Sequence, residues 1–188
     1  MKNAVFARPK IYRIALDALF VALYVILGTF LSFKIPGAIQ ISFSTLPILL
    51  SAFLFQPSDA ITVAVVGNFL EQVVDPSPYG FATLLIWLIP GAVQALVASL
   101  GARTVRNAES KRKIAILTVL VIVCADLVLT LLNTGALYLD GYLLHYHVKA
   151  LHLLLPMRLL NAVVRSVISC ILLPLLLPPL RKALERMR

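Results

Sequence analysis

Two arginines, Arg158 and Arg165, stand inside an apolar run that continues to Leu180. A guanidinium stays protonated and is costly to place in hydrocarbon, so each must face a protein interior, a partner carboxylate or a bound ligand. Such a group can anchor an anionic ligand through charge-assisted hydrogen bonds. The segment 153–165 is therefore the first place to look for a function.

The composition shows what surrounds these arginines. The chain is 61% hydrophobic with a mean hydropathy of +0.96, whereas soluble domains are about 45–50% apolar. This predicts an integral membrane protein with a single domain over residues 1–188. The net charge of +9 does not indicate nucleic-acid binding, because the basic residues flank apolar segments as topology signals do. Cys124 and Cys170 lie inside apolar runs, so neither a disulfide framework nor a metal motif is expected.

Apolar segments predict an all-α membrane protein with six transmembrane helices. A helix crosses a hydrocarbon core of about 30 Å with roughly 20 residues. The second segment carries Pro47 and is expected to form a short or broken helix, and Ser58 or Asp59 is expected to cap the third. The predicted spans cover residues 11–33, 41–55, 60–74, 81–102, 114–137 and 153–180.

The basic residues indicate the orientation of these helices. Thirteen of the 17 lysines and arginines precede the first span, follow the fourth or follow the sixth, whereas the opposite loops hold only Lys34 and Lys149. The positive-inside rule then places both termini in the cytoplasm.

This orientation brings the polar residues of several helices to one depth near the outer face. Apolar walls with a few convergent polar groups are typical of small-molecule pockets. The predicted ligand-binding residues are Gln40, Asn68, Glu71, Gln72, Tyr79, Trp87, Asn133, Arg158 and Asn161.

A second polar layer is expected deeper in the membrane. Asp126 precedes Asn133 by seven residues and Arg165 follows Arg158 by seven, which is about 10 Å of helix. A buried charge needs compensation, so we predict an ion pair between Asp126 and Arg165. Arg158 and Glu71 would then be available to bind a ligand. Alternatively, these two residues form an ion pair with each other. The amides, taken singly, could equally form hydrogen bonds between helices.

No catalytic or metal-binding residues are predicted. His145, His147 and His152 are spaced by two and five residues in a loop, which does not place them on one face. An intramembrane enzyme would need a nucleophile beside a base, or a metal-ligand cluster. Glu71 could form an acidic pair with Asp126 or Asp140, but their predicted depths differ. A stand-alone secondary transporter should show an inverted repeat, and none is visible.

Several segments, in their order and spacing, resemble the substrate-binding S components of energy-coupling factor (ECF) transporters, the bacterial and archaeal vitamin importers. The first helix also carries an AxxxA pair, Ala18 and Ala22, and small residues four apart allow close approach of another helix. The segments that carry the resemblance are ISFSTLPILLSAFLF (41–55), GNFLEQ (67–72), YGFATLLIWLIPGAVQAL (79–96), LLNTGALYLDGY (131–142) and LLPMRLLNAVV (154–164).

The resemblance implies a non-enzymatic subunit in the plasma membrane of a bacterium or archaeon. It binds a vitamin near the outer face, and Ala18 and Ala22 contact a membrane-embedded T component. The chain has no GxxxxGK[ST] loop, so two ATPase subunits must supply the energy and the chain needs no cofactor of its own.

The resemblance implies that the substrate is a B-type vitamin. The segments resemble the group that holds pantothenate, folate, cobalamin and pyridoxine or hydroxymethylpyrimidine members. Arg158 suits a carboxylate and favours pantothenate or folate, whereas Tyr79, Phe81 and Trp87 could stack on a flat ring. Pantothenate is the favoured prediction. One departure is that Gln56–Asp59 stands where the family often has a glycine-rich turn.

Overall fold

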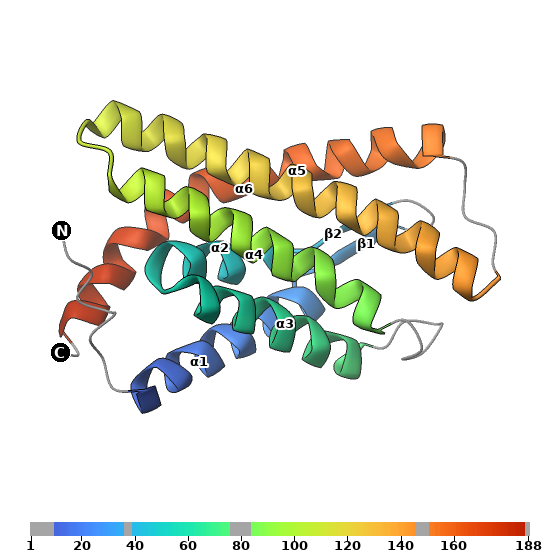
Figure 1. Ribbon diagram of the computed structural model, residues 1–188, viewed down its shortest axis with the longest axis horizontal. Helices are drawn as coiled ribbons and strands as arrows, with labels where there is room; N and C mark the ends of the chain where they lie inside the picture. Colours follow the sequence, from blue (N-terminus) through green and yellow to red (C-terminus); the bar gives the residue numbers. More distant parts are fainter. Residues whose placement is uncertain (1–9, 36–38, 76–83, 146–150, 187–188) are drawn as a thin grey trace.

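A computed structural model of the chain describes residues 10–35, 39–75, 84–145 and 151–186. Within them, six helices and one short hairpin run through an elongated bundle (Figure 1). The elements are α1 Lys10–Thr29, β1 Phe33–Ile35, β2 Ile39–Ile41, α2 Thr45–Leu54, α3 Pro57–Val74, α4 Leu84–Arg106, α5 Lys111–Leu143 and α6 Leu151–Arg186.

The helical fold and the six helices are confirmed, but not all six predicted crossings are. Among the described residues, four helices are long and apolar enough to cross a membrane. They cover Ile11–Thr29, Leu84–Arg106, Lys111–Leu143 and Leu155–Arg186. The second helix, α2, is too short, and α3 is not among the four.

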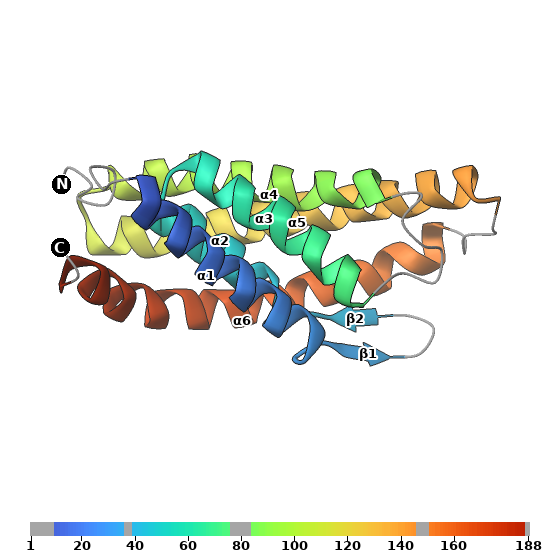
Figure 2. The same ribbon diagram turned by 90° about the horizontal axis from the view of Figure 1, so that it is seen from below.

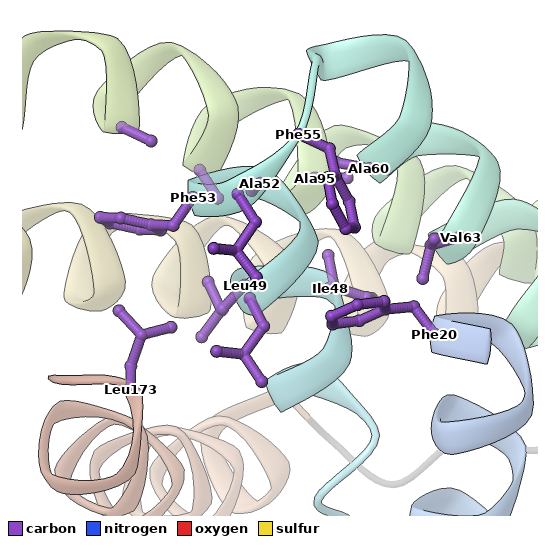
Figure 3. Close-up of a cluster of buried hydrophobic side chains, with 14 of the residues drawn as sticks. Phe20, Ile48, Leu49, Ala52, Phe53, Phe55, Ala60, Val63, Ala95 and Leu173 are labelled. Carbon is purple, nitrogen blue, oxygen red and sulfur yellow. The ribbon is translucent and has the colours of Figure 1, made fainter. Parts of the chain in front are cut away.

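The short α2 lies at the centre of the bundle. It has ten residues and all of them are buried, which agrees with the prediction of a short second helix. It contacts α1, α3, α4 and α6, and Figure 3 shows Ile48 and Leu49 among side chains from these elements. Phe20 of α1 and Phe55 meet edge to face beside it, with ring centroids 5.2 Å apart. A helix enclosed by protein need not span the bilayer, because its neighbours cover its ends.

A β-hairpin joins α1 to α2, and the sequence prediction missed it. β1 and β2 pair antiparallel with Phe33 opposite Ile41 and Ile35 opposite Ile39. The predicted first span to residue 33 and second span from residue 41 are therefore too long at these ends. The segments FKI and IQI alternate apolar and polar residues around a Pro-Gly pair, which is a hairpin pattern. In Figure 2 the hairpin lies beside α6, which contacts β2.

The start of α3 also differs from the prediction. The helix begins at Pro57, and its N-cap is Gln56 instead of Ser58 or Asp59. Asp59 occupies the third helical position and its side chain accepts from the Gln56 backbone N–H at 3.3 Å. This is a capping box whose cap residue is an amide, and Pro57 fits the first helical position because that position needs no N–H.

The helices place chain segments at two ends of the bundle. The start of α1, the end of α6 and the α4–α5 connection share one end, and the hairpin and the end of α3 lie toward the other (Figures 1 and 2). This is the arrangement that the predicted topology requires; that the first end faces the cytoplasm remains a prediction.

Candidate ligand-binding site

Amides on α3 hold this helix against α4 in the predicted outer layer. The Asn68 side chain donates to the Trp87 carbonyl at 2.9 Å, and Gln72 donates to the Asn68 side-chain oxygen at 2.8 Å. Pro90 lies inside the continuous helix α4, and a Cβ at Gly91 would make only ordinary contacts with Ala64 and Asn68 of α3. The structure therefore brings three predicted ligand residues together, and two of them hold the α3–α4 contact.

Glu71 of α3 contacts α1, another helix that packs against α3. Its carboxylate lies over Gly28 of α1, so close that a Cβ at Gly28 would be 2.4 Å from a carboxylate oxygen. The Tyr24 hydroxyl is hydrogen-bonded to Glu71 and to Ser44. Sequence reasoning assigned no role to Tyr24, although a tyrosine within an apolar span is a signal for a buried polar contact.

The remaining predicted ligand residues divide into two groups. Asn133 on α5 and Arg158 and Asn161 on α6 are half-buried side chains. Gln40 lies in β2, with its side chain outside what the structure describes, and Tyr79 lies outside the described residues altogether. Ligand binding by the nine residues remains a prediction.

The predicted ion pair between Asp126 and Arg165 is confirmed. Arg165 Nε lies 3.3 Å from Asp126 Oδ1, and the Asp126 side chain is completely buried. Gln94 of α4 donates to Asp126 Oδ1 at 2.9 Å, and Ser166 of α6 donates to Oδ2 at 2.8 Å. Both carboxylate oxygens are thus occupied, and three helices meet at one buried charge.

Arg165 is held by α5 in a fixed orientation. Its Nη2 donates to Thr130 Oγ1 at 3.1 Å and to the Asp126 carbonyl at 3.4 Å. Its Nε lies 3.3 Å from Asp126 Oδ1 as an ion-pair contact without a hydrogen bond. Sequence reasoning treated Arg165 as a structural residue only, and it left Gln94 and Ser166 unassigned.

A narrow pocket lies between α6 and the start of α2. It is a shallow gap whose roughly 200 Å³ of empty space includes open solvent, and it encloses no room for a water molecule. Thr45 Oγ1 and Ser169 Oγ in its wall are buried and have no hydrogen-bond partner. Serines and threonines concentrated near residues 42–45 and 166–169 were the sequence signal for it. The lining residues are Ser42, Phe43, Thr45, Leu46, Arg165, Ile168 and Ser169.

The described residues contain no group of three or more His, Cys, Asp or Glu side chains that could hold a metal ion. His145 is exposed at the end of α5 with a φ of 54°. His147 lies outside the described residues, and the side chain of His152 is not described. Ala18 and Ala22 are exposed on α1, which leaves the AxxxA pair accessible from the membrane side.

A family model described as "ECF-type riboflavin transporter, S component" matches residues 8–178. The chain belongs to this family. The ECF S component is thereby a multi-pass membrane protein that binds the substrate of a vitamin transporter, and it is not an enzyme. S components of this kind work with a T component and ATPase subunits in the membrane. No curated protein matched this S component.

The resemblance predicted from the sequence is confirmed at the level of the ECF S component. The family is named for riboflavin and gives no support to pantothenate or folate.

Proposed function

We propose that this S component captures riboflavin at the outer face of the membrane for ATP-driven import. The match to the riboflavin family over residues 8–178 carries the proposal. In this view the vitamin is bound by the outer polar layer, the energy comes from two ATPase subunits, and the chain holds no cofactor. The host membrane is the plasma membrane of a bacterium or archaeon.

The chemistry of the polar residues is compatible with an uncharged vitamin. Riboflavin carries ring carbonyls and a polyhydroxylated chain, which need hydrogen-bond donors and acceptors without a counter-ion. Asn133, Arg158 and Asn161 supply such groups from half-buried positions. A guanidinium donates to a neutral carbonyl as well as to a carboxylate, so Arg158 does not require an anionic substrate. The aromatic face of Trp87, also half-buried, suits a flat ring.

Purification from riboflavin-containing cells tests the proposal. We expect the S component to retain flavin at one per chain, seen in the visible absorbance spectrum. The flavin-free protein should quench riboflavin fluorescence on titration, while pantothenate and folate should not compete. Binding of pantothenate or folate with no effect of riboflavin would refute the assignment.

Variants of α6 locate the site. Arg158→Ala should lower riboflavin affinity about tenfold or more, because a hydrogen bond from a charged donor contributes roughly 1.5–3 kcal/mol. Arg103→Ala, an exposed arginine of α4, is the control and should bind as the wild type does. An Arg158→Ala protein with undiminished affinity would show that the anchor lies elsewhere.

A further inference from the structure

The end of the bundle that holds the α4–α5 connection concentrates positive charge. Residues 103–113 and 181–186 contain eight basic residues and two acidic ones, Glu109 and Glu185. The positive-inside rule accounts for such a bias at this end as a whole. It does not require basic side chains of different helices to lie close together, and three of the arginines do.

These three arginines come from the ends of α4 and α6. Arg103 and Arg106 lie in the last turn of α4, and Arg181 lies in the basic end of α6. Arg106 is half-buried, and its Nε donates to the Ala102 carbonyl at 3.2 Å, which holds the guanidinium against its own helix. Arg106 is close enough to Arg103 and to Arg181 to be repelled by both. Cations of two helices therefore share one small region.

Packing beneath the arginines keeps the two helix ends together. Val105 of α4 and Leu184 of α6 are buried in one hydrophobic cluster. Val105 stands between Arg103 and Arg106, and Leu184 follows Arg181 by three residues, about one helical turn. Like charges three residues apart on a helix repel, and the negative dipole end of α4 offsets only part of this repulsion. A bound anion would relieve the rest.

The surface of α4 that leads to this region is apolar. Leu96 and Leu100 are 40% and 49% exposed, and steps of four and three residues put them on one helix face with Arg103. The helix is long and apolar enough to cross a membrane, so its end lies near the lipid headgroups. Positive charge beside an exposed apolar face is complementary to a phosphate that carries acyl chains. A free phosphate would gain nothing from the leucines.

We propose that Arg103, Arg106 and Arg181 bind the phosphate of an anionic phospholipid whose acyl chains lie along Leu96 and Leu100. The planar guanidinium of arginine suits this role, because it donates paired hydrogen bonds to phosphate oxygens. Basic sites between transmembrane helices bind anionic lipid headgroups in this way. The lipid links the ends of α4 and α6, and the site is independent of which vitamin the protein binds.

Titration of the delipidated protein with a short-chain phosphatidylglycerol tests the site. In an uncharged detergent at low salt, native mass spectrometry should show saturable binding of this lipid and much weaker binding of phosphatidylcholine with the same chains. Arg103→Gln, Arg106→Gln and Arg181→Gln combined should lower the affinity at least thirtyfold, because a basic residue beside an anionic lipid contributes about fivefold. Arg181→Gln alone changes an exposed side chain and should lower it about three- to tenfold, so the test does not depend on the folding of the triple variant.

Lys111→Gln, Arg112→Gln and Lys113→Gln combined are the matched control. These three residues are exposed at the start of α5, at the same end of the bundle. Their replacement changes the net charge by the same amount as the arginine triple variant does. We expect the control to bind phosphatidylglycerol within about twofold of the wild type.

Four results would overturn the proposal. Equal losses in the two triple variants would show that the lipid responds only to the net charge of this end. Competition by inorganic phosphate, at matched ionic strength, as strong as that by phosphatidylglycerol would reduce the site to one for free anions. A wild-type protein that binds both lipids equally would show no selection of the headgroup. Undiminished affinity in Arg181→Gln and in the arginine triple variant would place the lipid elsewhere.

Discussion

At the scale of single residues, a glycine on each of α1 and α3 makes room for a bulky side chain of the other helix. Glu71 of α3 lies over Gly28 of α1, and Tyr24 of α1 lies over Gly67 of α3. The two contacts are reciprocal, and the Tyr24 hydroxyl and the Glu71 carboxylate are hydrogen-bonded. Without a hydrophobic force between helices in lipid, such close packing and polar contacts hold the pair together.

Gly67→Ala should therefore destabilise the protein. The added Cβ would lie 2.7 Å from the Tyr24 ring, and overpacking of this kind costs about 1–3 kcal/mol. Gly135→Ala is the control, because nothing lies within 4 Å of its added Cβ; it should be neutral or slightly stabilising through helix propensity. Thermal unfolding in detergent measures both, and equal midpoints would contradict the packing argument.

The buried pair of Asp126 and Arg165 could be predicted from the sequence because both residues lie within continuous helices. A seven-residue offset in each fixed their depth, and the rise of a helix is constant. The contacts of Gln94 and Ser166 could not be predicted, because helix rotation about its axis decides which polar residue faces the carboxylate. Sequence spacing predicts the depth of a side chain along the helix axis, whereas packing determines which neighbouring helix that side chain faces.

Removing one member of this pair should be far more damaging than replacing both. Asp126→Ala leaves the Arg165 charge without its carboxylate, and we expect a loss of about 3–5 kcal/mol. Asp126→Leu combined with Arg165→Met should recover most of this loss, since an apolar pair of similar size needs no compensation. Unfolding of the flavin-free proteins measures the difference; a single variant as stable as the wild type would show that the pair is dispensable.

At the scale of elements, the sequence predicted the helices better than their ends. Long apolar runs fixed the number and order of the helices, and Pro47 indicated that the second is short. The hairpin was missed because its two strands have three residues each, too few to stand out beside an apolar helix. The cap of α3 was missed because Gln56 is a rare N-cap, whereas Ser58 and Asp59 are residue types that usually cap helices.

The turn between α2 and α3, residues 55–59, also contacts α1. Arg13 of α1 pairs with Asp59 and donates to the Gln56 side chain at 3.2 Å. Asp59 therefore serves two elements, because it also accepts from the Gln56 backbone at the start of α3. This contact ties α1 to the turn that follows the buried helix α2.

A double-mutant cycle on Arg13 and Asp59 measures that connection. Asp59→Ala should cost more stability than Arg13→Ala, because it loses the helix cap as well as the ion pair. The coupling between the two should be about 0.2–1 kcal/mol, as the Arg13 side chain is 25% exposed and solvent screens the pair. Additive effects would show that the pair holds no coupling energy.

At the scale of the whole molecule, α1 presents a face of small and apolar residues outward. Ala18 and Ala22 are exposed there, with Leu19 at 63% exposure between them. In Figure 1 α1 lies at the lower edge of the bundle, with α5 above α3 and α4. The family could be predicted from the order of the segments, but the vitamin could not, because the side chains that select it depend on packing.

A bulky residue at this face should separate uptake from binding. Ala18→Leu and Ala22→Leu should keep riboflavin affinity, because both side chains point away from the bundle. Uptake of labelled riboflavin in cells that also express the T component and ATPase subunits should be abolished, because a helix cannot approach closely over leucine. Cys124→Leu on the exposed face of α5 is matched in exposure and should leave uptake intact. Equal loss of binding and uptake in the alanine variants would indicate a damaged fold and count against α1 as the partner surface.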